Sequence, residues 1–481
     1  MTGIQRTPPL RISLDALGEV LPVAIELGER FESRGFELAL VGGSVRDAML
    51  GRLGNDLDFT TNALPDEVLR ILRGWAESIW EVGIRFGTVG AVKDGYQLEI
   101  TTYRAESYDN DSRKPVVSFG DTLAQDLVRR DFTINAMAIT LPTIEFVDLH
   151  GGATDLAAGV IRTPGTPEQS FGDDPLRMMR AARFASQLEF TVDPIAVQAM
   201  TEMAARLEIV SPERVRDELS RLLLGDDPRR GLQLMVDTRL TQHVLPELPA
   251  LALEIDEHHR HKDVYEHSLV VLEQAIDLES AHKPMMNPDL ILRLAALLHD
   301  IGKPKTRRFE SAGGVSFHHH EVVGAKLTRK RLRALRYPNE VIDQVSKLVE
   351  LHLRFHGYSS GQWTDAAVRR YVRDAGDELN RLHKLTRADS TTRNRRKAAG
   401  LQASYDSLEQ RIAVLSEEEE MKAVRPDLDG QQIMETLGIP PGRDVGVAYK
   451  YLLERRLDRG PVDAAVAEVE LREWWAQRDQ P

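Results

Sequence analysis

Two aspartates separated by one residue, Asp56 and Asp58, are the first groups in this sequence whose spacing could do chemistry. The surrounding residues predict a strand over 56–60, and alternate side chains of a strand point to the same face. Two carboxylates on one face repel each other unless cations lie between them. Two Mg²⁺ ions are the usual partners of such a pair, and sites of this kind drive phosphoryl or nucleotidyl transfer.

A glycine turn, Gly42-Gly43-Ser44, lies shortly before these aspartates, between a predicted strand over 36–41 and a predicted helix start over 45–50. Free backbone N–H groups at such a turn can hold a phosphate, and Arg46 just behind it could pair with the same anion. Alone, the turn or the Asp-x-Asp pair would be an ordinary structural feature. Their combination in strand, turn, helix, strand order predicts a nucleotide-binding site.

A third carboxylate, Glu99, falls in a predicted strand over 96–103 that follows a hairpin turn over 93–95. Its side chain would share one face of the strand with Gln97 and Thr101. This placement makes Glu99 a candidate third carboxylate beside the aspartate pair, and the alternative is an ordinary surface residue. The polar stretch over 103–120 that follows is predicted to be a mobile loop.

Two arginine-rich strings follow the predicted sheet. In LVRRDFTINAMAI, over 127–139, Arg129 and Arg130 precede Asp131 and a run of core-facing residues. In FGDDPLRMMRAARF, over 171–184, an acid begins a predicted helix and three arginines follow it at intervals of three: Asp174, Arg177, Arg180 and Arg183.

An acid and an arginine three residues apart on a helix are often only an ion pair. The chemistry that fits the second string better is base recognition. A carboxylate accepts from an exocyclic amino group while an arginine donates to the neighbouring ring acceptor, a pattern shared by adenine and cytosine.

A separate set of histidines and aspartates lies further along, on predicted helices and in the order His, His-Asp, Asp. The order resembles that of HD phosphohydrolase domains, as does the string HDIGK over 299–303. The resemblance implies one set of metal ligands and two further histidines for a second metal: His267, His299, Asp300 and Asp389, then His320 and His352. Histidine and carboxylate ligands suit Mn²⁺, Ni²⁺, Zn²⁺ or Mg²⁺, and a helix cap or a loop is the alternative for these residues.

The composition limits the number of domains and the kinds of site that this protein can have. The 481 residues are enough for three or four domains, the net charge is −13 and cysteine is absent. Disulfides and thiolate metal sites are thereby excluded. We expect no membrane span, because no run of 18 apolar residues occurs, and we expect a cytoplasmic location, because the first residues lack a signal-peptide core. Two basic stripes, over 326–336 and 381–397, could contact RNA phosphates or simply be solvated helix faces.

Taken together, the motifs resemble those of the class II tRNA CCA-adding enzymes and bacterial poly(A) polymerases, whose head is a polymerase-β-like nucleotidyltransferase. The strings over 40–61, 127–139 and 171–184 carry the resemblance, and SPERVRDEL over 211–219 supports it. It implies Mg²⁺ on Asp56 and Asp58. It also implies CTP or ATP on a larger set of residues: Gly43, Arg46, Arg130, Asp174, Arg177, Arg180 and Arg183.

The predicted fold class is α+β, with a mixed α/β nucleotidyltransferase head followed by an all-helical neck, HD domain and tail. The expected boundaries are 1–165 for the head, 166–250 for the neck with its base template, 251–395 for the HD-type domain and 396–481 for a tail that contacts RNA. Within the tail, residues 428–460 predict a helix, a Gly-Pro turn and a second helix.

Three functions remain open at this point. The first is addition of CCA to tRNA 3′ ends from CTP and ATP, the second is poly(A) addition to RNA 3′ ends, and the third is HD phosphohydrolysis with a nucleotide-sensing head. The intact Asp-x-Asp pair argues against a mere sensor. The string VGIRFGTV over 82–89 is closer to the GIKHGTV form of CCA-adding enzymes than to the Gly-Arg-Arg-Phe form of poly(A) polymerases, which favours CCA addition. Oligomeric state and addition of only CC or only A stay undetermined.

Overall fold

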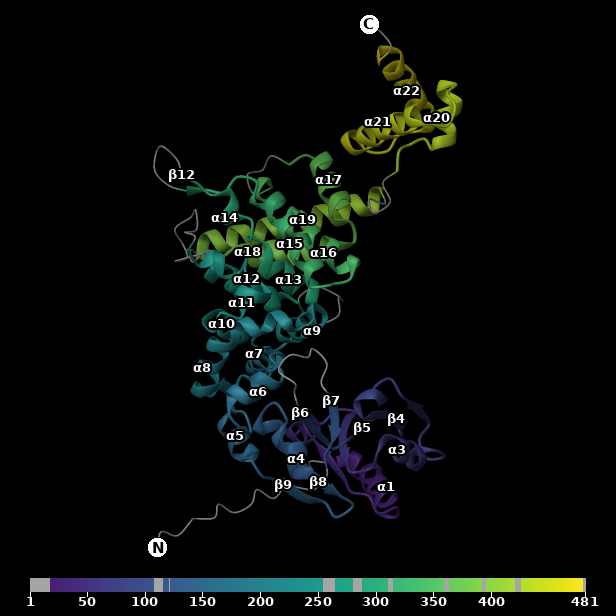
Figure 1. The fold of residues 1–481 in the computed structure, drawn as a ribbon. Helices are drawn as coiled ribbons and strands as arrows, with labels where there is room; N and C mark the ends of the chain where they lie inside the picture. The colour runs from purple at the N-terminus through teal and green to yellow at the C-terminus, as the bar shows by residue number, and fades with distance from the viewer. Residues whose placement is uncertain are drawn as a thin grey trace. The chain divides into compact units, whose positions relative to one another are not determined.

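A computed structural model describes residues 18–107, 116–120, 122–253, 264–279, 288–309, 315–358, 363–391, 395–419 and 425–478 (Figure 1). The chain divides into two compact units, Met1–Val244 and Leu245–Pro481. The first unit contains a mixed sheet and helices, and the second is almost wholly helical. The predicted α+β class is therefore confirmed.

The first unit is built on a seven-stranded sheet in the order β3-β4-β5-β2-β1-β8-β9. Only the central β2–β5 pair is parallel, and the other neighbours are antiparallel. This parallel pair carries the predicted carboxylates in adjacent strands. The strands are β1 (Leu38–Val41), β2 (Asp56–Thr61), β3 (Ser78–Trp80), β4 (Thr88–Lys93), β5 (Tyr96–Thr102), β8 (Met137–Leu141) and β9 (Glu145–Asp148).

Helices cover this sheet and fix the end of β1, where the glycine turn begins. Leu27 and Phe31 are fully buried on α1, which packs against β1 and β8. Ala39 and Val41 instead form a small core with Leu127 of α4. Because neighbouring residues of a strand face opposite sides, β1 is held between these two helices. The helices are α1 (Leu21–Glu32), α2 (Gly43–Met49), α3 (Pro65–Leu72), α4 (Leu123–Val128) and α5 (Gly152–Ala158).

The mobile loop predicted over 103–120 is only partly correct. Its flanks pair as an antiparallel hairpin, β6 (Arg104–Ser107) with β7 (Val116–Phe119). The β-branched residues Val116 and Val117 favour the second strand, and this signal was outweighed by the polar residues before it. Residues 108–115 lie outside the described part of the chain.

Helices complete the first unit after a short β10 (Val160–Ile161), which pairs with β11 (Thr191–Val192). Asp174 was predicted to begin one of these helices and to share its face with Arg177. Instead it follows α6 in an extended conformation (φ −141°, ψ 101°), with Pro175 before α7, because proline disfavours helical geometry at the preceding residue. The helices are α6 (Pro167–Asp173), α7 (Leu176–Leu188), α8 (Pro194–Met203), α9 (Pro212–Leu223), α10 (Pro228–Asp237) and α11 (Thr241–Val244).

The second unit contains a helical bundle around α13, whose residues 292–298 are all buried. A helix that is buried on every side belongs at the centre of a bundle, and α12, α16 and α18 pack against it. The helices are α12 (Val264–Leu278), α13 (Leu290–Leu298), α14 (Lys303–Thr306), α15 (His320–Ala334), α16 (Asn339–Leu351), α17 (Asp365–Ala375), α18 (Leu379–Asp389) and α19 (Arg395–Glu419), with a small β12–β13 hairpin (Arg308–Phe309, Val315–Ser316).

The last helices form a small core of their own, made of Leu428, Ile433, Ala448, Leu452, Ala467 and Leu471. The predicted helix, turn and helix are present as α20 (Gly430–Leu437) and α21 (Arg443–Arg459), and α22 (Ala464–Arg478) completes the group. Gly438 ends α20 at φ +66°, a left-handed cap that glycine adopts without strain. Of the helices that the structure describes, none combines the length and apolarity that a membrane span requires.

Candidate functional site

The register of the central strands brings the three predicted carboxylates together. In the parallel β2–β5 pair, Asp58 lies opposite Glu99 and Asp56 lies opposite Gln97. Paired residues of neighbouring strands point to the same face, so Asp58 and Glu99 project side by side. The position expected for a third carboxylate is thus occupied by Glu99.

A cavity of about 360 Å³ opens over these strands. Five of the residues predicted from the sequence line it: Asp58, Glu99, Arg130, Asp174 and Arg177. The rest of its lining was not predicted as functional, namely Val41, Phe59, Thr101, Asp126 and Arg129. Four further residues assigned to the nucleotide, and Asp56, are not part of this lining, although they belong to the same unit: Gly43, Arg46, Arg180 and Arg183.

The electrostatics of the cavity favour a bound cation. Burial raises the pKa of Asp58, with further increases from Glu99 and Asp56 that Arg130 and Arg180 only partly oppose. A carboxylate with a raised pKa has too little positive charge around it. Divalent cations with oxygen ligands would supply that charge, so Asp56, Asp58 and Glu99 fit a magnesium site.

The glycine turn is tied to the carboxylate strand by Ser44. The backbone N–H of Asp58 donates to Ser44 Oγ at 2.9 Å, and the hydroxyl lies 3.4 Å from the Asp56 carbonyl oxygen. Gly42 has φ +71°, and a Cβ there would fall 2.9 Å from Arg130 Nη1. The turn therefore favours glycine at position 42 for its backbone conformation, and Arg130 lies close beside it.

Arg46 does not face the cavity in this structure. Its guanidinium donates to Asn135 Oδ1 at 2.6 Å and to the Asp47 carboxylate at 2.8 and 3.0 Å. The ring of Phe184 lies 5.1 Å from the guanidinium carbon. Arg46 thus links the glycine turn to the 3₁₀ turn that contains Asn135 and to α7, and any anion contact would compete with these bonds.

Arg130 lies beside the glycine turn, and one of the two terminal nitrogens of its guanidinium already has a hydrogen-bond partner. Its Nη2 donates to Asp126 Oδ2 at 2.9 Å, which fixes the guanidinium through an i, i+4 pair after α4. Its buried Nε has no hydrogen-bond partner among the described residues. The side chain is therefore held in place by Asp126 on the wall of the cavity, where its positive charge can attract a phosphate.

The predicted Asp174–Arg177 pair is close in space but is not an ion pair. Asp174 Oδ1 accepts the N–H of Leu176 at 3.1 Å, and its Oδ2 accepts from Arg214 Nη2 at 2.8 Å. Arg177 donates instead to the Arg129 carbonyl oxygen at 2.6 Å and to Ser170 Oγ at 2.9 Å. The expectation that Arg177 holds Asp174 in place is therefore wrong: Arg214, from α9, does so.

Arg180 and Arg183 form a partly buried network behind this pair. Both engage Glu218 of α9, Arg183 through an Nε–Oε2 bond of 2.6 Å and Arg180 at 3.5 Å. Arg180 also donates twice to Asp131. Burial opposes ionisation of Asp131, but Arg180 and Asn135 outweigh it and lower the pKa to about 2. These charges connect α7, α9 and the RRD string into one support for the cavity wall.

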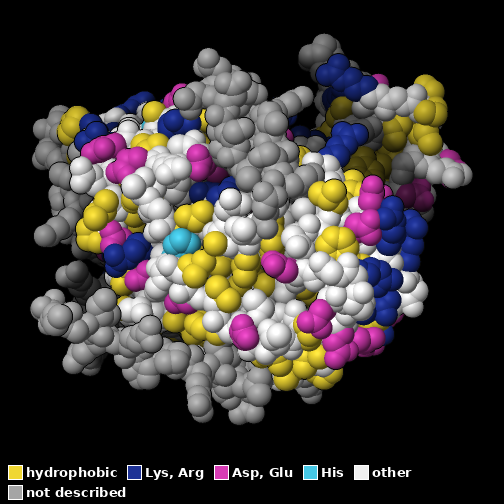
Figure 2. Space-filling model, turned by 60° about the horizontal axis from the view of Figure 1, so that its bottom comes forward, with side chains coloured by type: hydrophobic (Ala, Val, Ile, Leu, Met, Phe, Trp, Pro, Cys, Tyr) yellow, Lys and Arg dark blue, Asp and Glu magenta, His cyan; other side chains and the backbone are white. Residues whose placement is uncertain are grey.

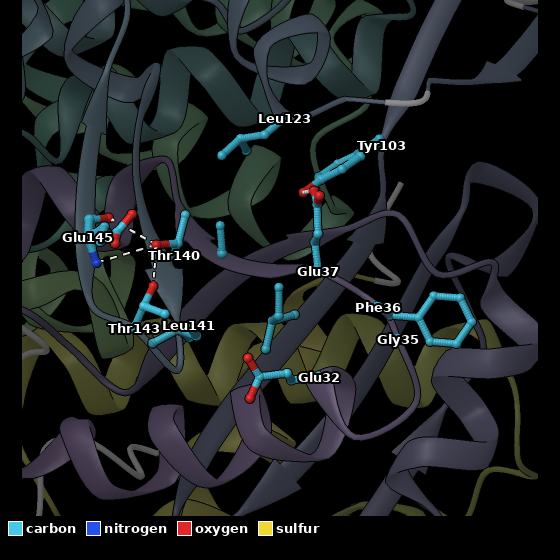
Figure 3. Close-up of a pocket in the computed structure, with 12 residues that line it drawn as sticks. Glu32, Gly35, Phe36, Glu37, Tyr103, Leu123, Thr140, Leu141, Thr143 and Glu145 are labelled. Atoms are coloured by element: carbon cyan, nitrogen blue, oxygen red, sulfur yellow. Dashed lines mark hydrogen bonds between the residues drawn. The ribbon is translucent and has the colours of Figure 1, made fainter.

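A second cavity in the first unit, of about 430 Å³, has the opposite chemistry (Figure 3). Three carboxylates line it, those of Glu32, Glu37 and Glu145, without lysine or arginine among the lining residues. The Tyr103 hydroxyl points toward Glu37 and donates to its Oε2 at 3.1 Å, as Figure 3 shows. An anionic triphosphate is repelled by such a lining, so the cavity over β2 and β5 is the better nucleotide site.

In the second unit, the six predicted histidines and aspartates converge on one point. They come from the first turn of α12, the first residue of α15, the last residue of α18 and the residues just after α13 and α16. Their donor atoms fall into two groups, each within 4.8 Å: His267, His299 and Asp389, and Asp300, His320 and His352. Asp300 lies between the groups: its Oδ1 is 3.2 Å from His320, and its Oδ2 is 3.2 Å from His299, with which the sequence had grouped it.

The histidines are oriented as metal ligands. The Nδ1 atoms of His299, His320 and His352 each lie 2.6–2.8 Å from a backbone carbonyl oxygen three residues earlier. This contact requires a proton on Nδ1, so it is the Nε2 atom of each ring that can bind a metal once it carries no proton. Burial and the neighbouring His299 lower the pKa of His352 to about 3, so its ring stays neutral, and its Nε2 has no hydrogen-bond partner among the described residues. These residues fit divalent transition metals.

Comparison with known protein families shows which domains each part of the chain resembles. Residues 38–162 match the family described as poly(A) polymerase head domain, and residues 264–394 match the HD domain family. The chain thus contains one segment similar to a poly(A) polymerase head domain and another similar to an HD domain. Between them, residues 189–251 match the family described as "Probable RNA and SrmB- binding site of polymerase A". The resemblance to class II CCA-adding enzymes and bacterial poly(A) polymerases is thereby confirmed.

Individual relatives agree with this assignment. The CCA-adding enzyme of Lactobacillus helveticus is 43% identical over 234 residues, which are 48% of this chain and 57% of that enzyme. The alignment thus spans little more than half of the curated relative. The crystal structure of the Bacillus stearothermophilus CCA-adding enzyme with CTP is 26% identical and has a TM-score of 0.70, covering 96% of this chain and 98% of that one. The Thermotoga maritima CCA-adding enzyme complexed with tRNA, at 20% identity and a TM-score of 0.60, shares the fold.

Several residues that line or support the head cavity were not predicted from the sequence to be functional. Thr101 had a usable signal, because it lies two residues after Glu99 on the same strand face. Asp126 had one too, because it stands four residues before Arg130 at helical spacing. Arg214 had none, since it lies 40 residues from Asp174 and meets it only through the packing of α7 against α9.

Proposed function

We propose that this protein adds CCA to the 3′ ends of tRNA from CTP and ATP. The observation that carries the proposal is the single cavity in which Asp58 and Glu99 face Arg130, Asp174 and Arg177. It combines a cation-binding pair, a phosphate-binding arginine and a base-reading pair, which are the parts that nucleotidyl transfer needs. The relatives described above are named CCA-adding enzymes, which supports the tRNA substrate.

The division of labour follows from the positions of the side chains. Asp56, Asp58 and Glu99 would hold Mg²⁺, which when bound lowers the pKa of the attacking 3′-hydroxyl and neutralises the triphosphate. Arg130 would contact the triphosphate beside Gly42. Ser44 keeps the glycine turn and the carboxylate strand at a fixed separation, so that phosphate and hydroxyl are presented in one geometry.

Base choice would be made by Asp174 and Arg177. Asp174 accepts from the amino group common to adenine and cytosine, and Arg177 donates to the adjacent ring acceptor. Uracil would place a carbonyl oxygen against the carboxylate. In this arrangement Arg180 and Arg183 support the reading pair through Glu218 and do not themselves touch the base.

RNA contact must be local, because the chain is acidic overall. On the face shown in Figure 2, lysine and arginine side chains are separated by acidic and hydrophobic ones. The stripe on α15 exposes Lys326, Lys330 and Arg333, which fall on one helix face, and we assign phosphate contact to it. In the second stripe, Arg381 pairs with Asp289 and Arg387 with Glu409, which favours a structural role there.

The test uses tRNA transcripts that end at the discriminator base or after CC, with labelled CTP or ATP alone and together. We expect CTP alone to add two residues to the first transcript, ATP alone to add one to the second, and both to stop at CCA. Long homopolymer tails with ATP would instead identify a poly(A) polymerase. Absence of incorporation into any RNA would contradict nucleotidyl transfer altogether.

The HD domain supports a second activity, hydrolysis of phosphate esters. The six converging ligands provide two metal positions, and a pair of bound metal ions can hold a phosphate and activate water. Lys303 Nζ lies 2.9 Å from Asp300 Oδ2, so a cation already stands beside the ligands. Release of phosphate from phosphomonoesters, or opening of cyclic phosphodiesters, in the presence of added Mn²⁺, Ni²⁺ or Zn²⁺ is the assay.

A further inference from the structure

One aromatic ring lies on the catalytic face of the head sheet without a role in the site described above. Trp80 of β3 pairs with Gly90 of β4 in the antiparallel register. A Cβ built at Gly90 would fall 1.9 Å from the Trp80 indole. The indole therefore lies across the backbone of Gly90, on the side to which a Gly90 side chain would point, and only glycine leaves room for it.

This side of the sheet is the one that carries the carboxylates. Gly90 pairs with Glu99, and Glu99 pairs with Asp58. Residues in register across a sheet point to the same face, so the indole, Glu99 and Asp58 form one row. With neighbouring strands about 4.8 Å apart, Gly90 lies roughly 10 Å from Asp58. A nucleoside spans a similar distance when its sugar hydroxyl is at the carboxylates and its base lies outward.

The base-reading pair occupies the other flank of the carboxylates. Arg177 is bonded to the Arg129 carbonyl oxygen, at the end of α4, and α4 packs on β1. In the strand order, β1 lies on one side of β2, and β5, β4 and β3 lie on the other. An incoming nucleotide whose base meets Asp174 and Arg177 leaves the β5–β4–β3 flank to the second substrate, the RNA whose 3′-hydroxyl attacks.

We infer that Trp80 is the stacking platform for the terminal base of the RNA acceptor, an inference that rests on the proposed nucleotidyl transfer. During CCA addition the terminal base changes from the discriminator to C and to C again. A hydrogen-bonding pocket built for one base would reject the others. An aromatic face accepts any base, because every base has a π-face.

The neighbouring turn supports an RNA strand on this flank. The turn over 83–87 joins β3 to β4, with a Cβ at Gly83 falling 2.9 Å from the Thr88 Cβ. Thr88 Oγ1 lies 2.9 Å from Thr101 Oγ1, and Thr101 lines the cavity. At the tip, Arg85 is exposed and Phe86 is 55% exposed, which places a cation and a second ring where the backbone and the next base of an entering strand would pass.

The experiment compares wild type with Trp80→Ala, Trp80→Phe and, as a matched control at an exposed ring of the second unit, Phe309→Ala. Steady-state transfer is measured with tRNA lacking CCA and with CTP, each varied in turn. We expect Trp80→Ala to raise the KM for RNA about five- to a hundredfold, the range found when a base-stacking ring is removed. The KM for CTP should stay within about twofold, because its base is held on the other flank, and Trp80→Phe should restore most of the RNA affinity. An unchanged KM for RNA in Trp80→Ala, or an equal rise for both substrates, would overturn the inference.

A measurement on the wild-type protein covers the case in which the alanine variant fails to fold. RNA with 2-aminopurine at its 3′ terminus should lose fluorescence on binding, while the same probe placed several nucleotides upstream in the acceptor arm should lose much less. Anisotropy of an end label reports binding itself. Bound RNA without terminal quenching would refute the platform even if transfer proceeds. Terminal quenching without any transfer would leave the platform standing and refute the proposed reaction.

Discussion

The two carboxylate centres of this protein are built in opposite ways. In the head, Asp58 and Glu99 project into an open cavity, and the pKa of Asp58 is raised because burial and its acidic neighbours exceed the nearby positive charge. In the HD domain, burial also disfavours the charged form of Asp300, but His299 and Lys303 outweigh it and hold the pKa of this carboxyl well below its usual range. One centre lacks positive charge and the other is already supplied with it.

This contrast suggests how each centre acquires its metal. Five of the six HD ligands are buried, and backbone carbonyls fix three of the four rings, so the metal site is largely formed before a metal binds. The head carboxylates have no such support, and Mg²⁺ dehydrates reluctantly and binds best together with substrate phosphates. We therefore expect the HD metal to be tightly held, and the head metal to come and go with each nucleotide.

The largest effect should come from Asp58→Asn. The substitution keeps the size of the side chain and removes the charge that a catalytic cation needs, so transfer should fall about a thousandfold or more. Metal content of the HD domain, measured by mass spectrometry, should not change. Asp66→Asn, at an exposed position in the first turn of α3, is the matched control. Transfer within tenfold of wild type would contradict the head metal site.

The second-largest effect tests whether the metal site of the HD domain is formed before the metal binds. Asp300→Asn should weaken binding of a transition metal by more than the roughly 10–100-fold that loss of a supporting hydrogen-bond partner costs, because it removes a direct ligand. Competition with a chelator measures this, and His319→Gln, whose ring is exposed beside the metal site, should behave as wild type. CMP transfer should persist in Asp300→Asn. A folded variant that loses both activities would show that the two centres are not independent.

The carboxylates on the strands of the head site could be predicted, because the face to which each one points depends only on its neighbours in the sequence. Asp56, Asp58 and Glu99 reach one face through a period of two, and the parallel register of β2 and β5 then aligns them. Buried residues of the RRD string such as Phe132, Ile134 and Met137 were likewise predicted to face the core and are fully buried. The β6–β7 hairpin was missed, because its second strand is short and follows a long polar stretch.

Contacts between distant segments could not be predicted in the same way. Helical spacing suggested that Arg177 would hold Asp174, but Pro175 interrupts the helix between them and gives that contact to Arg214. Arg46 has the position of a phosphate ligand, yet its partner Asn135 lies 89 residues away. For the HD domain, the motif named the six residues that converge, but their arrangement around two metal positions depends on how five helices pack.

A selectivity change, smaller than the loss of either metal, is expected from Asp174→Ala. Removing the carboxylate removes its repulsion of the uracil carbonyl, so the ratio of kcat/KM for CTP to that for UTP should fall about ten- to a hundredfold. CTP and ATP should weaken while UTP becomes tolerated. Asp173→Ala, at the adjacent acid outside the cavity lining, should keep the wild-type ratio. Equal losses for CTP, ATP, UTP and GTP would assign Asp174 a purely structural role.

The smallest effect should come from Arg214→Ala, and it decides how the reading carboxylate is held. Asp174 has two restraints, the N–H of Leu176 at 3.1 Å and the Arg214 guanidinium at 2.8 Å. The Arg214 side chain is 54% exposed, and exposed ion pairs contribute at most about 1 kcal/mol, so the CTP-to-UTP ratio should fall about two- to fivefold. Because salt screens such a pair, the difference from wild type should shrink as ionic strength rises, whereas the Asp174→Ala defect should persist. Arg216→Ala, whose partner is Asp217, serves as the control on the same helix. A ratio unchanged by Arg214→Ala would mean that the backbone bond at Leu176 suffices, and a fall as large as that of Asp174→Ala would mean that the two residues read the base as a unit.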